Sequence, residues 1–225
     1  MEILRIRDKL TNSNCYIIAE QGKAVVIDPN HPTKIIQEII KRELVPEYVL
    51  LTHEHCDHIQ GLSALRKAWP VLVVAQKKCS EGMQSVKKNM SGMMEVYLYF
   101  KSGGTVSVQY TPFVCEPADC IFETKKELFL GENKFVMVSA PGHTHGSSCI
   151  FLHDQKESDG SKYLFSGDYF LPGEQVITRL PGGSEEEYEQ IGRPWLAELP
   201  EGLIVLPGHG DRFVLTEEVK KAYGL

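Results

Sequence analysis

Residues 53–58 read His-Glu-His-Cys-Asp-His, so three imidazoles and two carboxylates fall within six residues, directly after the apolar run 48–51. A solvated loop rarely concentrates so many ligand groups. A buried loop can hold them only if something neutralises them, because desolvating several ionisable groups together is costly. A divalent cation does this directly. The segment therefore predicts a metal site, and a fold that brings further ligands to the end of the preceding strand.

Three downstream turns each carry another candidate ligand. They read Pro-Gly-His-Thr-His-Gly-Ser at 141–147, Ser-Gly-Asp at 166–168 and Pro-Gly-His-Gly at 207–210. Each follows an apolar run that is typical of a strand, at 135–138, 163–165 and 203–206 respectively. Because the strands of one sheet can bring the loops at their ends together, we expect one rim to collect all the ligands.

The order of these motifs, HxHxDH followed by PGHT, GD and PGHG, resembles the metallo-β-lactamase superfamily from about residue 14 to residue 209. The resemblance implies an α/β fold, the four-layer αβ/βα sandwich of that family. It also implies seven metal ligands. His53, His55 and His143 would bind one ion, Asp57, His58 and His209 would bind the second, and Asp168 would bridge the pair.

The chemistry of this ligand set agrees with a pair of divalent ions. Imidazole and carboxylate donors without a thiolate suit zinc, iron or manganese, and zinc is the ion we expect. Seven ligands are too many for one tetrahedral ion but natural for two ions that share a bridge. Two metals roughly 3.5–4 Å apart can activate a water and hold a leaving oxygen, so hydrolysis is the expected reaction type.

Asp28 ends the apolar run 24–27, where the family has an acidic residue. The resemblance implies that Asp28 accepts a hydrogen bond from a metal-bound histidine and fixes its tautomer. The alternative is that Asp28 only opens the turn Asp28-Pro29-Asn30, a common use of Asp before Pro. We favour the hydrogen bond to a ligand.

Three residues beside the ligands have candidate roles other than binding metal. Cys56 lies between ligands, so we expect its side chain to point away from the metals and either to pack or to support a ligand from outside, and not to act as a nucleophile. His145 is a candidate substrate contact or general acid, although an extra histidine is more often a rim residue. Tyr169 is a candidate substrate contact that points a phenol at a developing oxyanion, with packing beside the strand as the favoured alternative.

Length and composition favour one cytoplasmic domain over residues 1–225. The first seven residues alternate like a strand rather than a signal peptide, and no run approaches the roughly 20 apolar residues of a membrane span.

The six cysteines show no CxxC pair, so we expect reduced thiols. A net charge of −6 argues against a nucleic-acid partner. The expected partner is a small-molecule substrate, and a homodimer stays open.

Apolar spacing predicts helices that pack on sheets. Strands are expected at about 2–7, 14–19, 23–28 and 48–51, and helices at about 33–44 and 57–69. The first helix should lay Ile35, Ile36, Ile39, Ile40 and Leu44 on a sheet. Ser184 to Glu187 form a capping box that opens a further helix, and Pro194 should end or kink that helix.

The segment 77–110 departs from this alternation. It offers Met83, Met90, Met93 and Met94, followed by the aromatic-rich run 97–100. Met and aromatic residues make adaptable apolar surfaces, so the segment could form a lid, a substrate wall or a dimer contact. The alternative is a helix whose buried face is Val86, Met90, Met93 and Tyr97. Both interpretations stay open.

Within the family, three short stretches resemble the glyoxalase II-like branch: Asn-Cys-Tyr at 14–16, Leu-Pro-Gly-Gly at 180–183 and the closing PGHG. Two departures argue against carrying over its substrate. That branch usually has Gly-Arg-x-Asp where this chain has Val-Ile-Thr-Arg at 176–179. Glyoxalase II enzymes also carry a C-terminal helical region that grips glutathione, whereas only sixteen residues follow His209.

These residues favour a dinuclear metallohydrolase that acts on a small thioester or another acyl substrate such as a lactone. A metal-bridging hydroxide would attack the carbonyl, and Asp57 would orient this nucleophile as well as bind metal. Loss of Asp57 or His58 should therefore reduce turnover by orders of magnitude.

Several other functions share the motifs. A persulfide dioxygenase with one iron held by two His and one Asp is the main alternative. A nuclease that processes transfer RNA also fits the pattern of His53 to Leu62, but the acidic charge argues against it. A flavodiiron reductase is disfavoured by His55, and β-lactam hydrolysis by His58, where true lactamases commonly have Arg. A non-catalytic scaffold is the least expected function.

Overall fold

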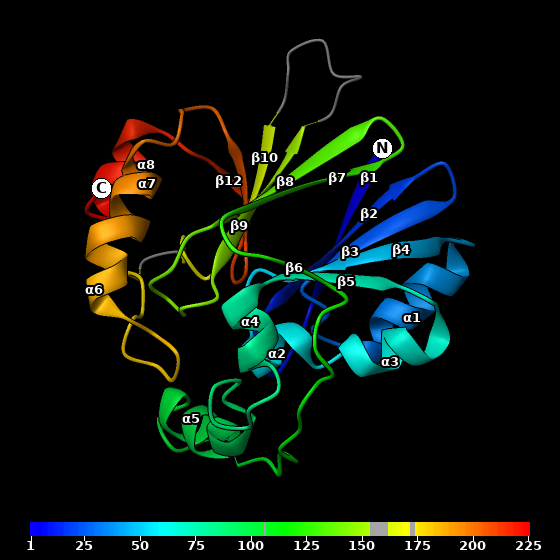
Figure 1. Ribbon diagram of the computed structural model, residues 1–225. Coiled ribbons are helices and arrows are strands. Elements are labelled where there is room, and N and C mark those ends of the chain that lie inside the picture. The colour runs from blue at the N-terminus through cyan, green and yellow to red at the C-terminus, as the bar shows by residue number, and fades with distance from the viewer. Residues whose placement is uncertain (106, 154–161, 172–173) are drawn as a thin grey trace.

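Two six-stranded sheets form the centre of the molecule, and helices cover the outer face of each (Figure 1). The computed structural model describes residues 1–225 except 106, 154–161 and 172–173. Within these described residues, none of the helices combines the length and the apolar character that a membrane crossing requires.

The first sheet has the strand order β1-β2-β3-β4-β5-β6. Its strands are β1 (Glu2–Arg7), β2 (Asn14–Glu20), β3 (Lys23–Ile27), β4 (Val45–Leu50), β5 (Leu72–Gln76) and β6 (Cys120–Phe122). The first three strands pair antiparallel, and β3 to β6 pair parallel. The parallel half thus points the carboxyl ends of β3 and β4 in one direction.

The second sheet has the order β12-β11-β10-β9-β8-β7. Its strands are β7 (Lys125–Leu130), β8 (Asn133–Ser139), β9 (Ser148–His153), β10 (Lys162–Gly167), β11 (Ile204–Pro207) and β12 (Phe213–Val214). All neighbours pair antiparallel except β10 and β11, which pair parallel.

Alternate residues of the inner strands face different cores, as the period of two in a strand requires. In β3, Ala24 and Val26 join the apolar cluster under α1 (Pro32–Lys41) and α3 (Leu62–Ala68), while Val25 and Ile27 join the cluster between the sheets. A third cluster packs α7 (Arg193–Ala197) and α8 (Glu217–Ala222) on the second sheet. The α/β fold and its four-layer αβ/βα arrangement are confirmed.

The first predicted helix is shorter than expected. His31 caps α1, because its Nδ1 accepts a hydrogen bond from Lys34 N. The helix ends at Lys41 rather than at residue 44, since Glu43 takes a left-handed backbone with φ of 55°. Ile35 and Ile39 are buried as predicted, but Ile40 is 63% exposed, so the apolar stripe is narrower than the spacing indicates.

The predicted helix at 57–69 is two helices, α2 (Cys56–Ile59) and α3. Gly61 N donates to Pro29 O at 2.7 Å, and Ser13 Oγ donates to Asp57 O at 2.8 Å. The amide and carbonyl that would pair across a continuous helix are therefore both used elsewhere. A Cβ at Gly61 would lie 2.9 Å from Pro29 O, so only glycine allows this close approach.

The segment 77–110 is not the single helix that was the alternative. It contains α4 (Lys77–Gly82), the short 3₁₀ turn η1 (Ser91–Met93) and α5 (Met94–Lys101), which Figure 1 shows at the end of the view opposite the N-terminus. Val86 and Met93 are exposed, and Met90 has a left-handed backbone that stops helix propagation. Among the described residues of the segment, the buried apolar side chains are Cys79, Met83, Met90, Met94 and Leu98.

Ser184 caps the next helix as predicted, because its hydroxyl accepts a hydrogen bond from Glu187 N at 3.2 Å. The capping box is only half formed, since Ser184 N donates to Gly142 O and Glu187 Oε2 contacts His145 Nδ1 instead. The short helix α6 (Glu185–Glu187) continues through the π-helical turn η2 (Tyr188–Gly192) into α7. Pro194 does not end this helical run, which continues to Ala197. The departure from α-helical geometry is the π-helical turn directly before Pro194.

Candidate metal centre

The predicted ligands follow the carboxyl ends of strands, and those strands belong to both sheets rather than to one. The loop of residues 53–58 follows β4 in the first sheet. His143, Asp168 and His209 follow β8, β10 and β11 in the second sheet. The expectation of a single-sheet rim is corrected: the ligands meet where one end of each sheet faces the other.

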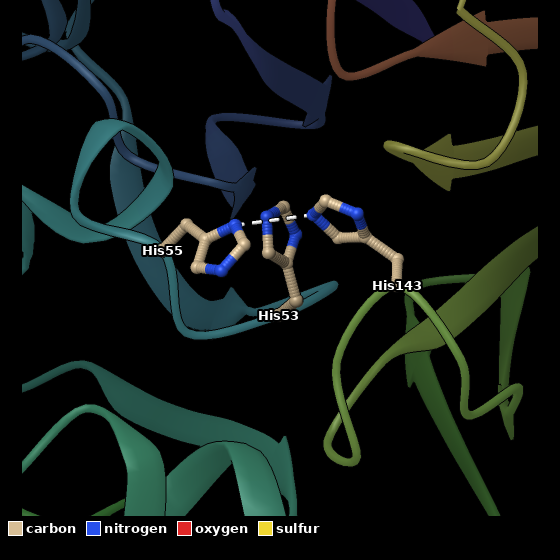
Figure 2. Close-up of side chains that lie close together, drawn as sticks. All are labelled: His53, His55 and His143. Carbon is tan, nitrogen blue, oxygen red and sulfur yellow. Dashed lines mark hydrogen bonds between the residues drawn. The ribbon is translucent and has the colours of Figure 1, made fainter. Parts of the chain in front are cut away.

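His53, His55 and His143 form the first cluster, with their ligand atoms within 4.8 Å of one another. All three side chains are buried, and His143 Nε2 lies 3.1 Å from His55 Nδ1. Figure 2 shows the three rings side by side, with His143 approaching from the opposite side to His55. The cluster thus consists of two histidines from a loop after the first sheet's β4 and one from a turn after the second sheet's β8.

Fixed acceptors determine which ring nitrogens face this cluster. His143 Nδ1 donates to Ile177 O at 2.8 Å, and His55 Nε2 lies 3.4 Å from Pro181 O, which can only accept. His143 Nε2 and His55 Nδ1 are therefore the free lone pairs. His53 Nε2 is buried without a hydrogen-bond partner among the described residues. Three converging imidazole lone pairs, one of them otherwise orphaned, fit a divalent metal ion.

Asp57, His58 and His209 form the second cluster, also within 4.8 Å. His209 Nε2 lies 3.4 Å from both Asp57 Oδ2 and His58 Nε2. Of the three side chains, His58 is fully buried, whereas Asp57 is 13% and His209 is 17% exposed. The donor set of two imidazoles and one carboxylate again suits a divalent ion.

Asp168 lies between the two clusters. Its Oδ2 is 3.7 Å from His143 Nε2 in the first cluster and 3.5 Å from His209 Nε2 in the second. Its Oδ1 is 3.3 Å from His58 Nε2. This is the position that a bridging carboxylate requires, although the bridging role itself stays a prediction.

Asp28 connects to both clusters from outside. Its Oδ2 lies 3.2 Å from His58 Nδ1, which carries the hydrogen because a carboxylate only accepts. The same oxygen accepts the Thr52 hydroxyl at 2.6 Å, and Thr52 Oγ1 lies 3.0 Å from His53 Nδ1. One carboxylate thus orients a histidine in each cluster, as such outer partners of metal ligands do. Thr52 was not singled out from the sequence.

The charges of the two clusters differ. Burial, with the neighbouring His143, lowers the pKa of His55 to about 3, and burial also lowers the pKa of His53 well below its ordinary value. Burial opposes the charge of His209 too, but Asp168 and Asp57 outweigh it and raise the pKa of His209 to about 9. Without metal, the first cluster presents neutral imidazoles and the second holds imidazole–carboxylate pairs.

Glu54, which lies between two ligands, was counted in the motif but given no role from the sequence. Its side chain is buried, and Oε2 accepts the Thr144 hydroxyl at 2.8 Å. Burial raises the pKa of this carboxyl to about 7. Only the tertiary contact with Thr144 distinguishes Glu54 from a solvated loop residue, so no local signal could have found it.

Cys56, His145 and Tyr169 have separate environments. Cys56 is buried against Met90, Met94 and Leu98, which confirms packing. His145 Nδ1 lies 2.6 Å from Glu187 Oε2 and 46% of its side chain is exposed, so its contact with a substrate stays a prediction.

Tyr169 is buried, and its hydroxyl donates to Ala140 O. The Tyr169 hydroxyl oxygen accepts from His143 N at 3.4 Å, and the Tyr169 ring stacks on Tyr188. Tyr169 therefore has the packing role that was the favoured alternative to a substrate contact. Its phenol is hydrogen-bonded to the backbone of the turn that carries His143.

The buried side chains of α5 pack on the loop of the first motif. Met94 and Leu98 contact Cys56 in one cluster, with Leu180 packed against the same cluster. Tyr110 adds to this layer, which we call the wall, since its hydroxyl lies 2.9 Å from Gln60 Oε1. A contact of this wall with substrate, its movement as a lid and a dimer contact all stay predictions.

Comparisons with known proteins agree with this geometry. A family model described as the metallo-beta-lactamase superfamily matches residues 8–209. The probable metallo-hydrolase YqgX of Bacillus subtilis is 30% identical over 92% of this chain and 89% of its own length. The hydroxyacylglutathione hydrolase of Salmonella dublin is 27% identical over 84% of this chain, which spans 58% of that enzyme. The crystal structure of BLEG-1 B3 metallo-beta-lactamase matches with a TM-score of 0.74 and 26% identity, covering 95% of this chain and 94% of the other.

Proposed function

The chain belongs to the metallo-beta-lactamase superfamily, and from that premise we propose that it is a dinuclear metallohydrolase for a small thioester or another acyl substrate such as a lactone. The observation that carries the proposal is the pair of ligand clusters with Asp168 between them. The two clusters offer separate sets of ligand atoms, so a single ion would use only one of them.

The side chains of the two clusters would hold the metal ions, orient the attacking water and accept its proton. Bound in the two clusters, divalent ions would supply Lewis acidity and a water that is activated near neutral pH. Asp57 would orient that water as well as bind metal, because its carboxylate is partly accessible and Ser13 holds its backbone carbonyl. His58 would be kept in one tautomer by Asp28. Zinc is the ion we propose, since the clusters offer nitrogen and oxygen donors.

The acyl substrate rests on the relatives. The name hydroxyacylglutathione hydrolase denotes an acyl substrate, and that enzyme shares this chain's glyoxalase II-like branch. Because the match spans only 58% of the enzyme, we do not carry over the glutathione part. A small-molecule substrate, a cytoplasmic location and the absence of a nucleic-acid partner belong to the same proposal.

The test is hydrolysis of a panel of thioesters and lactones by protein loaded with zinc. The Asp57→Ala variant should lose at least about 100-fold in kcat, the range typical of a lost acid–base group. Asp211→Ala is the matched control, because this carboxylate is exposed and pairs only with Arg5 among the described residues. Near-normal turnover in Asp57→Ala would contradict the proposed role of Asp57 in orienting the attacking water.

The persulfide dioxygenase and nuclease alternatives stay predictions. Oxygen consumption on a persulfide by protein that holds one iron would favour the first. Cleavage of transfer-RNA precursors without hydrolysis of any acyl substrate would favour the second.

A further inference from the structure

We propose that Glu54 is a positioning residue, whose buried side chain locks the loop of His53 and His55 to the turn of His143. The inference rests on the proposed metal centre, because its purpose is to hold three imidazoles of the first cluster in one arrangement. It adds a residue that binds no metal and that the ligand motif itself does not require.

The first observation is the contact between the two loops. Thr144 Oγ1 donates to Glu54 Oε2 at 2.8 Å. Thr144 in turn is held by its own turn, because its N donates to Ser147 Oγ at 3.0 Å and its hydroxyl oxygen accepts Gly146 N at 3.2 Å. The Glu54 carboxyl therefore accepts a hydrogen bond from Thr144, the residue directly after His143, and Thr144 is itself fixed by hydrogen bonds within its turn.

The second observation is how tightly the carboxyl is enclosed. A Cβ at Gly82, the last residue of α4, would lie 2.6 Å from Glu54 Cγ and 2.8 Å from Oε1. A Cβ at Gly182 would lie 3.1 Å from the same oxygen. Backbone from two further segments thus closes on Glu54, and its side chain has one position to occupy.

The third observation is the missing counter-charge. Among the described residues, no lysine or arginine forms an ion pair with Glu54, although the side chain is only 1% exposed. Burying a carboxyl without an ion pair is unfavourable, so an apolar side chain would fill this space at lower cost. What the carboxyl adds is its directional hydrogen bond to Thr144.

That bond has a specific place in the site. The two sheets are already joined at the base of these loops, where Ser148 N donates to Thr52 O at 2.8 Å. The contact of Glu54 with Thr144 joins them again near the tips, beside the imidazoles. Fixing both ends of each loop sets the angle at which His143 meets His53 and His55.

The experiment measures zinc affinity by competition with a chromophoric chelator, together with the visible absorption of the cobalt(II)-substituted protein. Glu54→Ala should bind the tighter zinc equivalent about 10–100-fold more weakly, the range for outer partners of metal ligands, with an altered cobalt spectrum. Glu54→Gln keeps an oxygen that accepts from Thr144, so its affinity and spectrum should stay near those of the wild type.

Thr144 provides an independent pair of variants if Glu54→Ala fails to fold. Thr144→Val removes the donor and should weaken zinc binding, whereas Thr144→Ser keeps the hydroxyl and should not. Glu81→Ala is the control, because this neighbouring glutamate is exposed and pairs with Lys78.

The outcomes separate this inference from the proposed function. Wild-type zinc affinity and an unchanged cobalt spectrum in folded Glu54→Ala or Thr144→Val would overturn the positioning role alone. Failure of the wild type to bind zinc or cobalt would overturn the metal centre, and the positioning role with it.

Discussion

At the scale of single residues, Asp28 is the clearest case of a position with two readings. Its left-handed backbone, with φ of 51°, fits a turn, and its carboxylate also contacts Thr52 and His58. The Asp28→Asn substitution separates the two, because Asn tolerates this backbone as well as Asp does but its amide nitrogen cannot accept a hydrogen bond.

We expect Asp28→Asn to keep the turn, to lose about 1–3 kcal/mol of folding stability because a buried donor on Thr52 or His58 loses its acceptor, and to lose about 10–100-fold in metal affinity. Urea unfolding of the metal-free protein and metal titration check the two halves of this statement. Wild-type metal affinity in the variant would reduce Asp28 to a turn residue.

Glu54 predicts a pH dependence in the metal-free protein. Burial raises its pKa from 4.5 to about 7, so between these pH values the folded chain keeps a proton that the unfolded chain releases. Stability linked to Glu54 is therefore full below about pH 4.5 and falls as the pH rises to 7. Glu54→Gln has no such proton to lose, so its advantage over the wild type should grow by roughly 3 kcal/mol across this range. Urea unfolding of both proteins at several pH values tests this, and parallel curves would contradict it.

How far the sequence predicted residue roles depended on where the information lies. The seven candidate ligands and Asp28 stand in short motifs at strand ends, so the motifs and the family resemblance they carry predicted that these residues lie together. Thr52, Glu54 and Tyr169 act through partners on other loops. Their roles depend on which loops meet, and no local pattern carries that information.

At the scale of elements, α5 forms the wall beside the centre through only a few buried side chains. Leu98 is 5% exposed and packs with Met94 and Cys56, whereas Val96 on the same helix is 55% exposed. Leu98→Ala should lower the local opening free energy of α5 by about 2–3 kcal/mol, and Val96→Ala should change it by less than about 0.5 kcal/mol. Native-state hydrogen exchange of the α5 amides makes the comparison. Equal exchange in both variants would show that the wall does not depend on this packing.

The predicted elements failed where backbone groups found partners outside their own helix. The break at Gly61 follows from its hydrogen bond to Pro29, and the end of α1 from the left-handed Glu43. The spacing of apolar residues predicts which face of a helix is buried. It does not predict that a backbone amide of the helix will donate to a carbonyl far away in the sequence. The left-handed Met90 had the same effect in the segment 77–110, where a regular helix was one of two alternatives.

At the scale of the whole molecule, the two sheets contribute complementary parts of one centre, so bound metal should stabilise the packing of one sheet on the other. A ligand at 100 times its dissociation constant adds about 2.7 kcal/mol to the folded state. For a chain of this size, removing each ion should therefore lower Tm by roughly 5–10 °C. Calorimetry before and after chelation measures this, and an unchanged Tm would mean that the ligands do not hold metal in the folded protein.

We propose that seven side chains on loops from both sheets hold two ions. Elemental analysis of protein purified without added metal or affinity tag measures how many ions the chain binds. We expect close to two divalent ions per wild-type chain and close to one in His209→Ala, which lacks a ligand of the second cluster only. One ion or none in the wild type, or two ions retained in His209→Ala, would contradict it.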